Sequence, residues 1–256
     1  MASLGLRATE LGPPDYLPAD PDALKALLDE HGLTLVGGFL AVPLHTGDRA
    51  PVDEADRVAA LLAAAGAEVL VLAAATGLDG YDERPALTDD EWRTLVATAA
   101  LVRDRAARHG LRTVLHPHVG THVERTAEVE RFLADSDLPL CLDTGHLLIG
   151  GTDPVDLARR HPGRVGHVHL KDVRADIAAA VRDGRLGYTE AVRQRRYVPL
   201  GDGDVDVAAL VAHLRDAGYT GWCVLEQDTA LADDSPADAP TRDTARSLAH
   251  LTHLTA

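Results

Sequence analysis

The stretch PLCLDTGH, residues 139–146, ends an apolar run with a carboxylate and an imidazole. The apolar residues before Asp143 are typical of a buried β-strand. Asp-Thr-Gly is a common way to end a strand, because Asp and Gly favour tight turns. Asp143 and His146 are also residue types that bind metals and transfer protons. The segment alone leaves a turn and a functional site open as interpretations, and the rest of the chain has to decide between them.

Six further segments resemble this strand, and helical patterns separate them along the chain. They span residues 7–12, 33–44, 68–74, 112–118, 165–171 and 222–227. Apolar strands that alternate with helices predict a parallel sheet covered on both faces. We predict an α/β fold of the TIM (β/α)8-barrel type, with a doubly wound sheet as the alternative. The chain has neither GxGxxG nor GxxxxGK[ST], which disfavours a doubly wound nucleotide-binding fold.

The helices between these strands carry recognisable end signals. Asp20-Pro21 begins one helix, which Gly32 ends, and Asp153-Pro154 begins another. Residues 88–91, TDDE, form a capping box at the start of a helix that runs to Gly110. These signals fix the alternation of strands and helices that a barrel requires.

The seven predicted strands are one fewer than a complete barrel contains. The chain begins with MASLG, which resembles the end of a helix leading directly into the first strand. We therefore predict a single domain, residues 1–256, that lacks the first βα unit. Three explanations remain open: a start placed too late, closure by a second chain in a homodimer, or a tolerated gap. The strands beside such a gap have open edges, which proteins normally cover.

The composition indicates an enzyme that acts on small molecules. The chain has 256 residues, 46% of them hydrophobic, and a net charge of −15, which disfavours nucleic acid and anionic membranes as partners. No apolar run approaches the ~20 residues that span a bilayer. The N-terminus lacks the pattern of a signal peptide, and the chain has only two cysteines. We therefore expect a cytoplasmic protein in a reducing compartment.

Metal-binding residue types follow four of the predicted strands, at the end where TIM barrels place their chemistry. They are His116, His118 and His122; Asp143 and His146; His167, His169 and Lys171; and Glu226 and Asp228. Burying unpaired charge inside a barrel is costly, so these groups should be paired or bound to a cation. Mixed oxygen and nitrogen ligands suit Mn²⁺, Co²⁺, Fe²⁺ or Zn²⁺ better than Ca²⁺. A single strand-end His is usually structural, so this prediction depends on the four strand ends together.

These segments resemble the sugar phosphate isomerase/epimerase superfamily, the xylose-isomerase-like TIM barrels, and most closely its inosose (2-keto-myo-inositol) dehydratases. The similar segments are ATELGP (8–13), LHPHVGTHVE (115–124), LDTGH (142–146), HVHLKDV (167–173), VPLGDGDVD (198–206) and LEQD (225–228). LDTGH and HLKD are typical of the superfamily, whereas GDGDVD and HPHVGTHVE are typical of the dehydratase-like branch. The resemblance covers nearly the whole chain.

The resemblance implies a role for each candidate residue. The implied metal ligands are His116, Asp143, His169 and Glu226. The implied catalytic residues are His118, His146 and Lys171, and the implied substrate-facing residues are Glu10 at the pocket rim, His122 and His167. The implied metal is Mn²⁺ or Co²⁺, with Mg²⁺, Fe²⁺ or Zn²⁺ as alternatives.

Two positions depart from the epimerases of this superfamily, which use two Glu residues on opposite faces of the sugar. His116 and His122 occupy the matching positions here. We therefore predict dehydration of a keto-cyclitol such as 2-keto-myo-inositol, through an enediolate that the metal stabilises. His118 or His146 would act as the base and Lys171 as the acid. An isomerase or epimerase of a related keto-sugar and an inactive metal- or sugar-binding barrel remain alternatives.

Residues 174–206 are long for a connection between a strand and a helix, and they contain six Arg. Their pattern is helical. We interpret them either as an ordinary solvated insertion or as a lid that excludes water from the strand ends.

Overall fold

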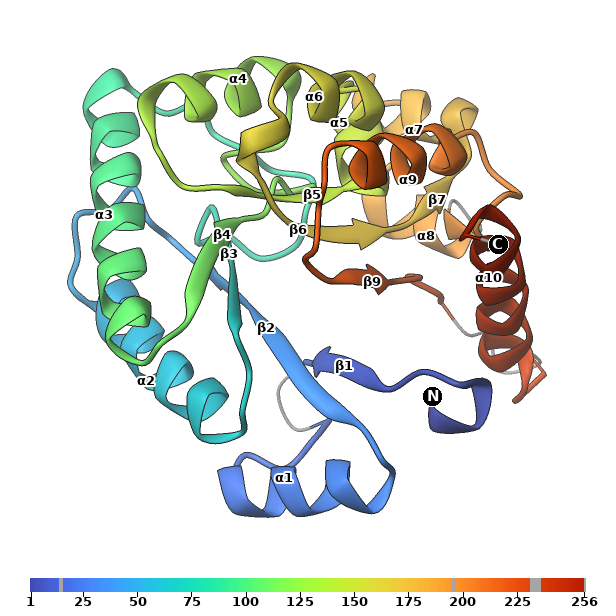
Figure 1. The fold of residues 1–256 in the computed structure, drawn as a ribbon. Coiled ribbons are helices and arrows are strands. Elements are labelled where there is room, and N and C mark those ends of the chain that lie inside the picture. The colour runs from blue at the N-terminus through green and yellow to red at the C-terminus, as the bar shows by residue number, and fades with distance from the viewer. Residues whose placement is uncertain (14–15, 195–196, 231–235, 256) are drawn as a thin grey trace.

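The structure, a computed structural model, describes residues 1–13, 16–194, 197–230 and 236–255. Parallel strands form a nearly closed barrel with helices around its outside (Figure 1). The barrel strands are β1 (Ala8–Leu11), β2 (Thr34–Val42), β3 (Val69–Ala74), β4 (Arg112–Leu115), β5 (Leu140–Asp143), β6 (Val165–Leu170) and β9 (Cys223–Leu225). They follow one another in chain order as a 7-stranded sheet, so the predicted barrel with seven strands is confirmed.

The barrel is open between its first and last strands. Among the described residues, β1 is paired only with β2, and β9 only with β6. Figure 1 shows β1 and β9 facing each other across the opening. The predicted absence of one strand is therefore a feature of the folded chain, at the position where an eighth strand would complete the ring.

Two strands that carry candidate residues are shorter than the sequence pattern predicts. β4 ends at Leu115 rather than at residue 118, because Pro117 has no N–H to donate to a neighbouring strand. β9 ends at Leu225 rather than at residue 227. His116, His118 and Glu226 therefore lie in the loops directly after strand ends.

The helices of the described residues are α1 (Pro21–Glu30), α2 (Ala50–Ala64), α3 (Asp89–Arg108), α4 (Thr126–Asp135), α5 (Thr144–Gly150), α6 (Pro154–Arg160), α7 (Ala175–Arg182), α8 (Tyr188–Arg193), α9 (Val207–Asp216) and α10 (Ala239–Thr255), with short 3₁₀ turns at Ala2–Leu4 and Pro162–Arg164. The three helices with a predicted start, α1, α3 and α6, begin at the predicted residues. Asp20 accepts the Ala23 N–H at the start of α1, and Thr88 and Glu91 form the predicted capping box of α3. Aliphatic side chains of these helices pack on the strands and make the core. No helix among the described residues is long and apolar enough to cross a membrane.

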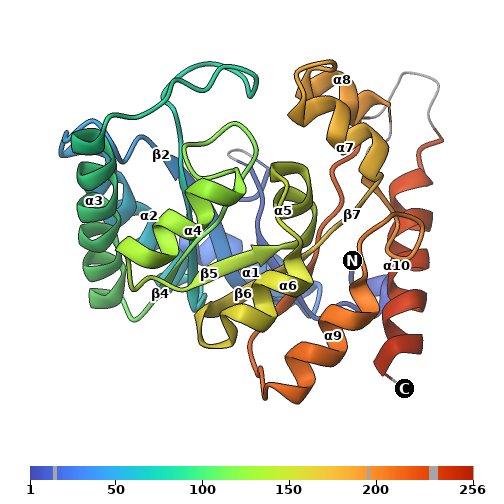
Figure 2. The same ribbon diagram turned by 90° about the horizontal axis from the view of Figure 1, so that it is seen from above.

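The long segment after β6 forms a separate small unit on the barrel. It contains α7, α8 and a two-stranded antiparallel ribbon, β7 (Asp172–Val173) and β8 (Tyr197–Val198), which the sequence pattern did not predict. Asp172 holds the loop that follows β8, because its carboxylate accepts hydrogen bonds from the N–H groups of Gly201, Gly203 and Val205 at 2.8–3.0 Å. Figure 2 shows α7 and α8 at the same end of the barrel as the loop between β3 and α3. The insertion is therefore anchored at its base and lies beside the strand ends.

Candidate metal centre and active site

Asp143 has a separate role for each of its carboxylate oxygens. Oδ1 accepts the His146 N–H at 2.8 Å and caps the start of α5. Oδ2 is buried without a hydrogen bond and lies 3.6 Å from both His116 Nε2 and His169 Nδ1. Asp143 therefore caps the following helix with one oxygen and faces the other candidate ligands with the second, so the two interpretations that the sequence offered do not exclude each other.

The four predicted metal ligands meet at this point. His116, Asp143, His169 and Glu226 each offer one ligand atom, and these atoms all lie within 4.8 Å of one another. Asp143 Oδ2, His169 Nδ1 and Glu226 Oε2 are buried atoms without a hydrogen-bond partner of good geometry, although the last two approach to 2.8 Å. Unpaired buried polar atoms are costly, and a divalent ion with bonds of about 2.0–2.2 Å would satisfy all three. The residues therefore fit a divalent metal.

Hydrogen bonds behind the two imidazoles orient them toward the centre. His116 Nδ1 lies 2.8 Å from the Pro117 carbonyl oxygen, which can only accept, so Nδ1 carries the proton and the Nε2 lone pair faces the site. His169 Nε2 lies 3.1 Å from the Glu10 carboxylate, which leaves His169 Nδ1 free for a metal. Such partners fix the tautomer of a metal-binding His and strengthen it as a ligand.

The charges of these groups suit a cation. Burial raises the pKa of Asp143, but the nearby Lys171 and imidazoles outweigh it and lower that pKa to about 2. Burial lowers the pKa of His116 to about 3, although Asp143 opposes this effect. Burial raises the pKa of Glu10, but hydrogen bonds with His167 and His169 lower it to about 2. Near neutral pH the carboxylates are charged and the His116 ring is neutral, which are the forms that bind metals. Burial lowers the pKa of His169, but Cys141, Glu226 and Asp143 raise it well above its usual value, so this ring must release a proton when it binds a metal.

Lys171 is the buried cation of the site. Its Nζ lies 3.4 Å from Asp143 Oδ2, 3.1 Å from Glu226 Oε1 and 3.3 Å from Asp228 Oδ2. Burial lowers the pKa of Lys171, but these three carboxylates raise it well above its usual value. A Cβ at Gly145 would lie 2.8 Å from the Lys171 Cβ, so the Gly of LDTGH allows this close approach. The ammonium group is thus held in its protonated form beside the candidate metal ligands.

His118 and His146 stand next to Lys171. His146 Nε2 lies 2.9 Å from Lys171 Nζ, and the His118 and His146 rings lie 3.8 Å apart between centroids. His118 Nδ1 contacts the Val119 carbonyl oxygen at 2.7 Å, so its Nε2 is the nitrogen left without a proton in the neutral ring. The structure therefore brings the three predicted catalytic residues together at the metal ligands.

The structure places the three predicted substrate-facing residues differently. Glu10 lies behind His169 rather than at a rim, and its Oε1 is 2.7 Å from His167 Nε2. The His167 side chain is fully buried, with its Nε2 turned toward Glu10. His122 packs against His45, with ring centroids 4.4 Å apart, outside the metal-ligand set. Contact of these three residues with a substrate stays a prediction.

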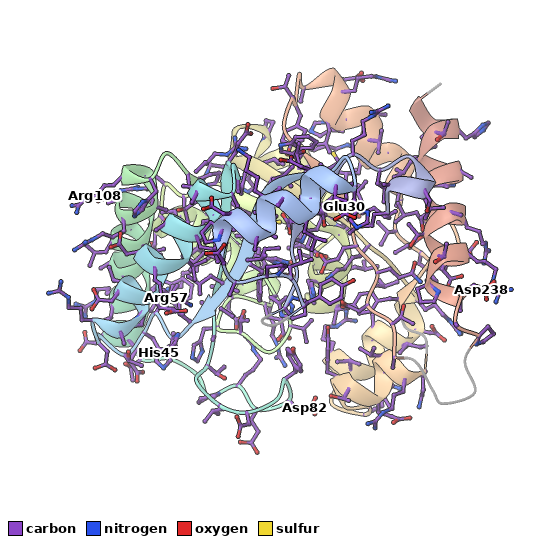
Figure 3. All side chains as sticks on the ribbon, turned by 90° about the horizontal axis from the view of Figure 1, so that it is seen from below. Glu30, His45, Arg57, Asp82, Arg108 and Asp238 are labelled. Carbon is purple, nitrogen blue, oxygen red and sulfur yellow. The ribbon has the colours of Figure 1, made fainter. Side chains whose placement is uncertain are left out.

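The sequence pattern missed the aromatic residues of the site. Tyr197 lies with its ring centroid 5.4 Å from Lys171 Nζ, and its hydroxyl is 3.1 Å from that of Tyr188. Asp82, labelled in Figure 3, accepts the Tyr188 N–H at 2.8 Å and ties α8 to the loop after β3. Phe39 of β2 contacts the His116 and His118 rings, at centroid distances of 5.7 and 5.6 Å. The sequence offered one signal for these residues: aromatics are only 4% of the chain, so each one could have been considered as a candidate site residue.

Comparison with known proteins agrees with the fold. The xylose isomerase-like TIM barrel family matches residues 1–252. The chain is 33% identical over 249 residues to an inosose dehydratase from Lacticaseibacillus casei, covering 91% of this chain and 82% of that protein. It is 35% identical over 247 residues to an inosose dehydratase from Erwinia tasmaniensis, with 91% and 82% covered.

A solved structure shows the same fold. The D-psicose 3-epimerase from Clostridium cellulolyticum H10, solved with D-tagatose, aligns with a TM-score of 0.75 at 17% identity, over 99% of this chain and 90% of that one. At this identity the likeness concerns the fold alone. With the barrel, the family match over residues 1–252 and the sequence relatives in agreement, the chain belongs to the xylose isomerase-like TIM barrel family.

Proposed function

We propose that this chain is a metal-dependent dehydratase that acts on a keto-cyclitol such as 2-keto-myo-inositol. The observation that carries the proposal is the placement of His118, His146 and Lys171 together beside four converging metal ligands. Its substrate class is supported by the relatives described as inosose dehydratases. Elimination of water next to a ketone needs a base for the proton α to the ketone, an acid for the departing β-hydroxyl and a positive charge near the ketone oxygen. The residues of this site are proposed to supply the base and the acid and to hold the cation.

The residues of the chain divide the reaction between them. A divalent ion held by His116, Asp143, His169 and Glu226 would supply Lewis-acid stabilisation of the charge that develops at the ketone. His118 or His146 takes the proton from the carbon next to the ketone. Lys171 gives a proton to the departing hydroxyl, and its three carboxylate neighbours keep it protonated until then. We take Mn²⁺ or Co²⁺ as the metal, because the ligands mix oxygen and nitrogen.

The insertion, residues 174–206, acts as the lid in this proposal. It contributes Tyr188 and Tyr197 next to Lys171 and His146. Water exclusion protects a reactive enolate and strengthens the electrostatic contacts around it. The chain is proposed to work in the cytoplasm, where its two free cysteines would stay reduced.

Epimerisation of a related keto-sugar is the second candidate, because it shares the first proton transfer and the fold. The position of His122 argues against it. His122 occupies the second epimerase position but packs on His45, away from the metal ligands. An epimerase needs a proton-transfer group on each face of the substrate, and this second group is not at the site.

Turnover of 2-keto-myo-inositol by protein loaded with Mn²⁺ or Co²⁺ tests the proposal. Dehydration removes one water from the mass and creates a chromophore, whereas epimerisation conserves the mass. We expect the loss of water, and we expect Lys171→Met to abolish it. Mass conservation with a new stereoisomer would establish the epimerase, and no change with fully loaded protein would support a barrel that only binds.

A further inference from the structure

Three large apolar side chains are exposed around one cavity next to His118. Phe39, Leu78 and Tyr81 are 44%, 48% and 45% exposed. All three line a cavity of about 270 Å³ that His118 also lines. Its volume is near the lower end of the range for small-molecule sites. We call these three residues the apolar wall.

The apolar wall is held in place by well-defined contacts. Phe39 projects from β2 against the His116 and His118 rings, and Tyr81 lies 6.0 Å from the His118 ring and 4.8 Å from the Tyr188 ring. The loop that carries Leu78 and Tyr81 is tied down on both sides. Three hydrogen bonds hold it: the Leu78 N–H donates to Thr76 Oγ1, Arg84 Nε donates to the Thr121 carbonyl oxygen, and the Tyr188 N–H donates to the Asp82 carboxylate. Figure 3 shows Asp82 of this loop next to the α7–α8 segment.

Rigid exposure of this kind points to a ligand. Apolar surface gains free energy when it leaves water, and side chains that are fixed in an exposed position cannot reach the core to do so. The wall lies directly beside the predicted base, His118, so that a molecule resting on it would present a carbon atom to that residue. The surface facing Phe39 and Leu78 must itself be apolar, because these two side chains offer it no hydrogen bonds.

We propose that the apolar wall receives the C–H face of a cyclitol ring whose hydroxyl groups are all equatorial. This inference deepens the proposed function and rests on it for the cyclitol class. In 2-keto-myo-inositol the ketone replaces the single axial hydroxyl of myo-inositol. Every remaining hydroxyl is equatorial, and each ring face presents only axial C–H bonds. An axial hydroxyl on the face toward Phe39 would lose its water without gaining a partner.

The wall is thus the element that selects substrate stereochemistry, while the metal ligands and Lys171 act at the ring edge. An apolar pocket that removes water from an extra hydroxyl group binds the molecule carrying that hydroxyl roughly tenfold to a hundredfold more weakly. Selection by the wall does not depend on the reacting carbons, so it can be measured with cyclitols that do not react.

The test compares the binding of scyllo-inositol and chiro-inositol to metal-loaded protein by calorimetry. scyllo-Inositol has no axial hydroxyl, whereas chiro-inositol has one on each ring face, so that neither face can rest on the wall without a penalty. The variants are Phe39→Ala, Tyr81→Ala and the control Leu101→Ala, whose side chain is 55% exposed on α3 and lines no part of this cavity. Thermal melting confirms that each variant is folded.

We expect wild-type protein and Leu101→Ala to prefer scyllo-inositol at least roughly tenfold, and Phe39→Ala and Tyr81→Ala to lose most of that preference. Equal binding of the two cyclitols, no binding of either, or a preference that survives both wall variants would overturn the inference. Turnover of 2-keto-myo-inositol by the same preparation separates this result from the proposed function. Turnover without the preference for scyllo-inositol would contradict the role of the apolar wall and leave the proposed dehydratase intact. The preference without turnover would contradict the dehydratase and leave the binding role of the wall intact.

Discussion

Lys171 Nζ lies 2.9 Å from His146 Nε2, and both side chains are buried. The two residues belong to the HLKD and LDTGH segments, 25 positions apart in the chain. The contact forms because β5 and β6 are neighbours in the parallel sheet, with Asp143 paired to His169. A buried ammonium and an imidazole in contact are suited to exchange protons with one substrate.

Replacement of Lys171 by Met should abolish turnover and leave the metal bound. The loss of a positioned acid typically lowers the rate by about 10²–10⁴-fold. Metal affinity should not fall, because removal of the ammonium leaves Asp143 and Glu226 with more negative charge for a cation. Metal analysis after dialysis and kcat with 2-keto-myo-inositol measure the two effects. A variant that loses its metal as well would make Lys171 a structural part of the centre instead of an acid.

The two roles of Asp143 can be separated by a pair of variants. Asp143→Asn should lose the metal but keep the cap, because Asn is also a good helix N-cap. Asp143→Ala should lose both the metal and the cap. Both variants lack the charge that faces Lys171, so the metal-free Ala variant should be less stable than the metal-free Asn variant by about 1 kcal/mol, the contribution of the cap. Metal stoichiometry and urea unfolding of the metal-free proteins distinguish them. Equal stability of the two variants would show that the Oδ1 contact with His146 does not stabilise α5.

Glu10 should support metal binding from behind His169. Glu10→Gln removes the negative charge that orients the imidazole, and loss of such a partner typically weakens metal binding about 10–100-fold. The matched control is Glu30→Gln, on the exposed end of α1 and labelled in Figure 3. Competition with a chelator gives both affinities. If Glu10→Gln bound metal like the control, the Glu10–His169 hydrogen bond would be unimportant for the centre.

The open edges of β1 and β9 should make the barrel sensitive to an added strand. An N-terminal extension of ~30 residues, about one βα unit from a relative, could pair with both edges. We expect a higher melting temperature, by about 2–4 °C for each kcal/mol gained, and tighter metal binding next to β9. A version with Pro inside the added strand is the control, because Pro cannot donate to the sheet.

Two other results would give the gap a different meaning. A dimer in light scattering whose edges are protected from hydrogen exchange would indicate closure by a second copy. A monomer that the extension does not stabilise would show that the fold tolerates the opening.

The sequence by itself determined the order of the strands and their number, and it placed the candidate metal ligands at the ends of neighbouring strands. Apolar periodicity and helix caps are local signals, and parallel strands necessarily bring their carboxyl ends to one edge. Asp143, His169 and Glu226 could therefore be placed together without coordinates. The exact strand ends were harder to predict from the sequence. His116 and His118 lie in a loop, because Pro117 ends β4.

Only the tertiary structure decided which polar residues lie together at the candidate metal centre and which lie elsewhere. Glu10 meets His167 across 157 positions of sequence, and no local pattern encodes such a contact. His122 follows a strand end as His118 does, yet the loop directs it to His45 instead of the metal ligands. The aromatic side chains around His118 come from β2, the loop after β3 and the insertion. Their meeting depends on how loops fold over the barrel, where many distant contacts act together and periodicity carries no information.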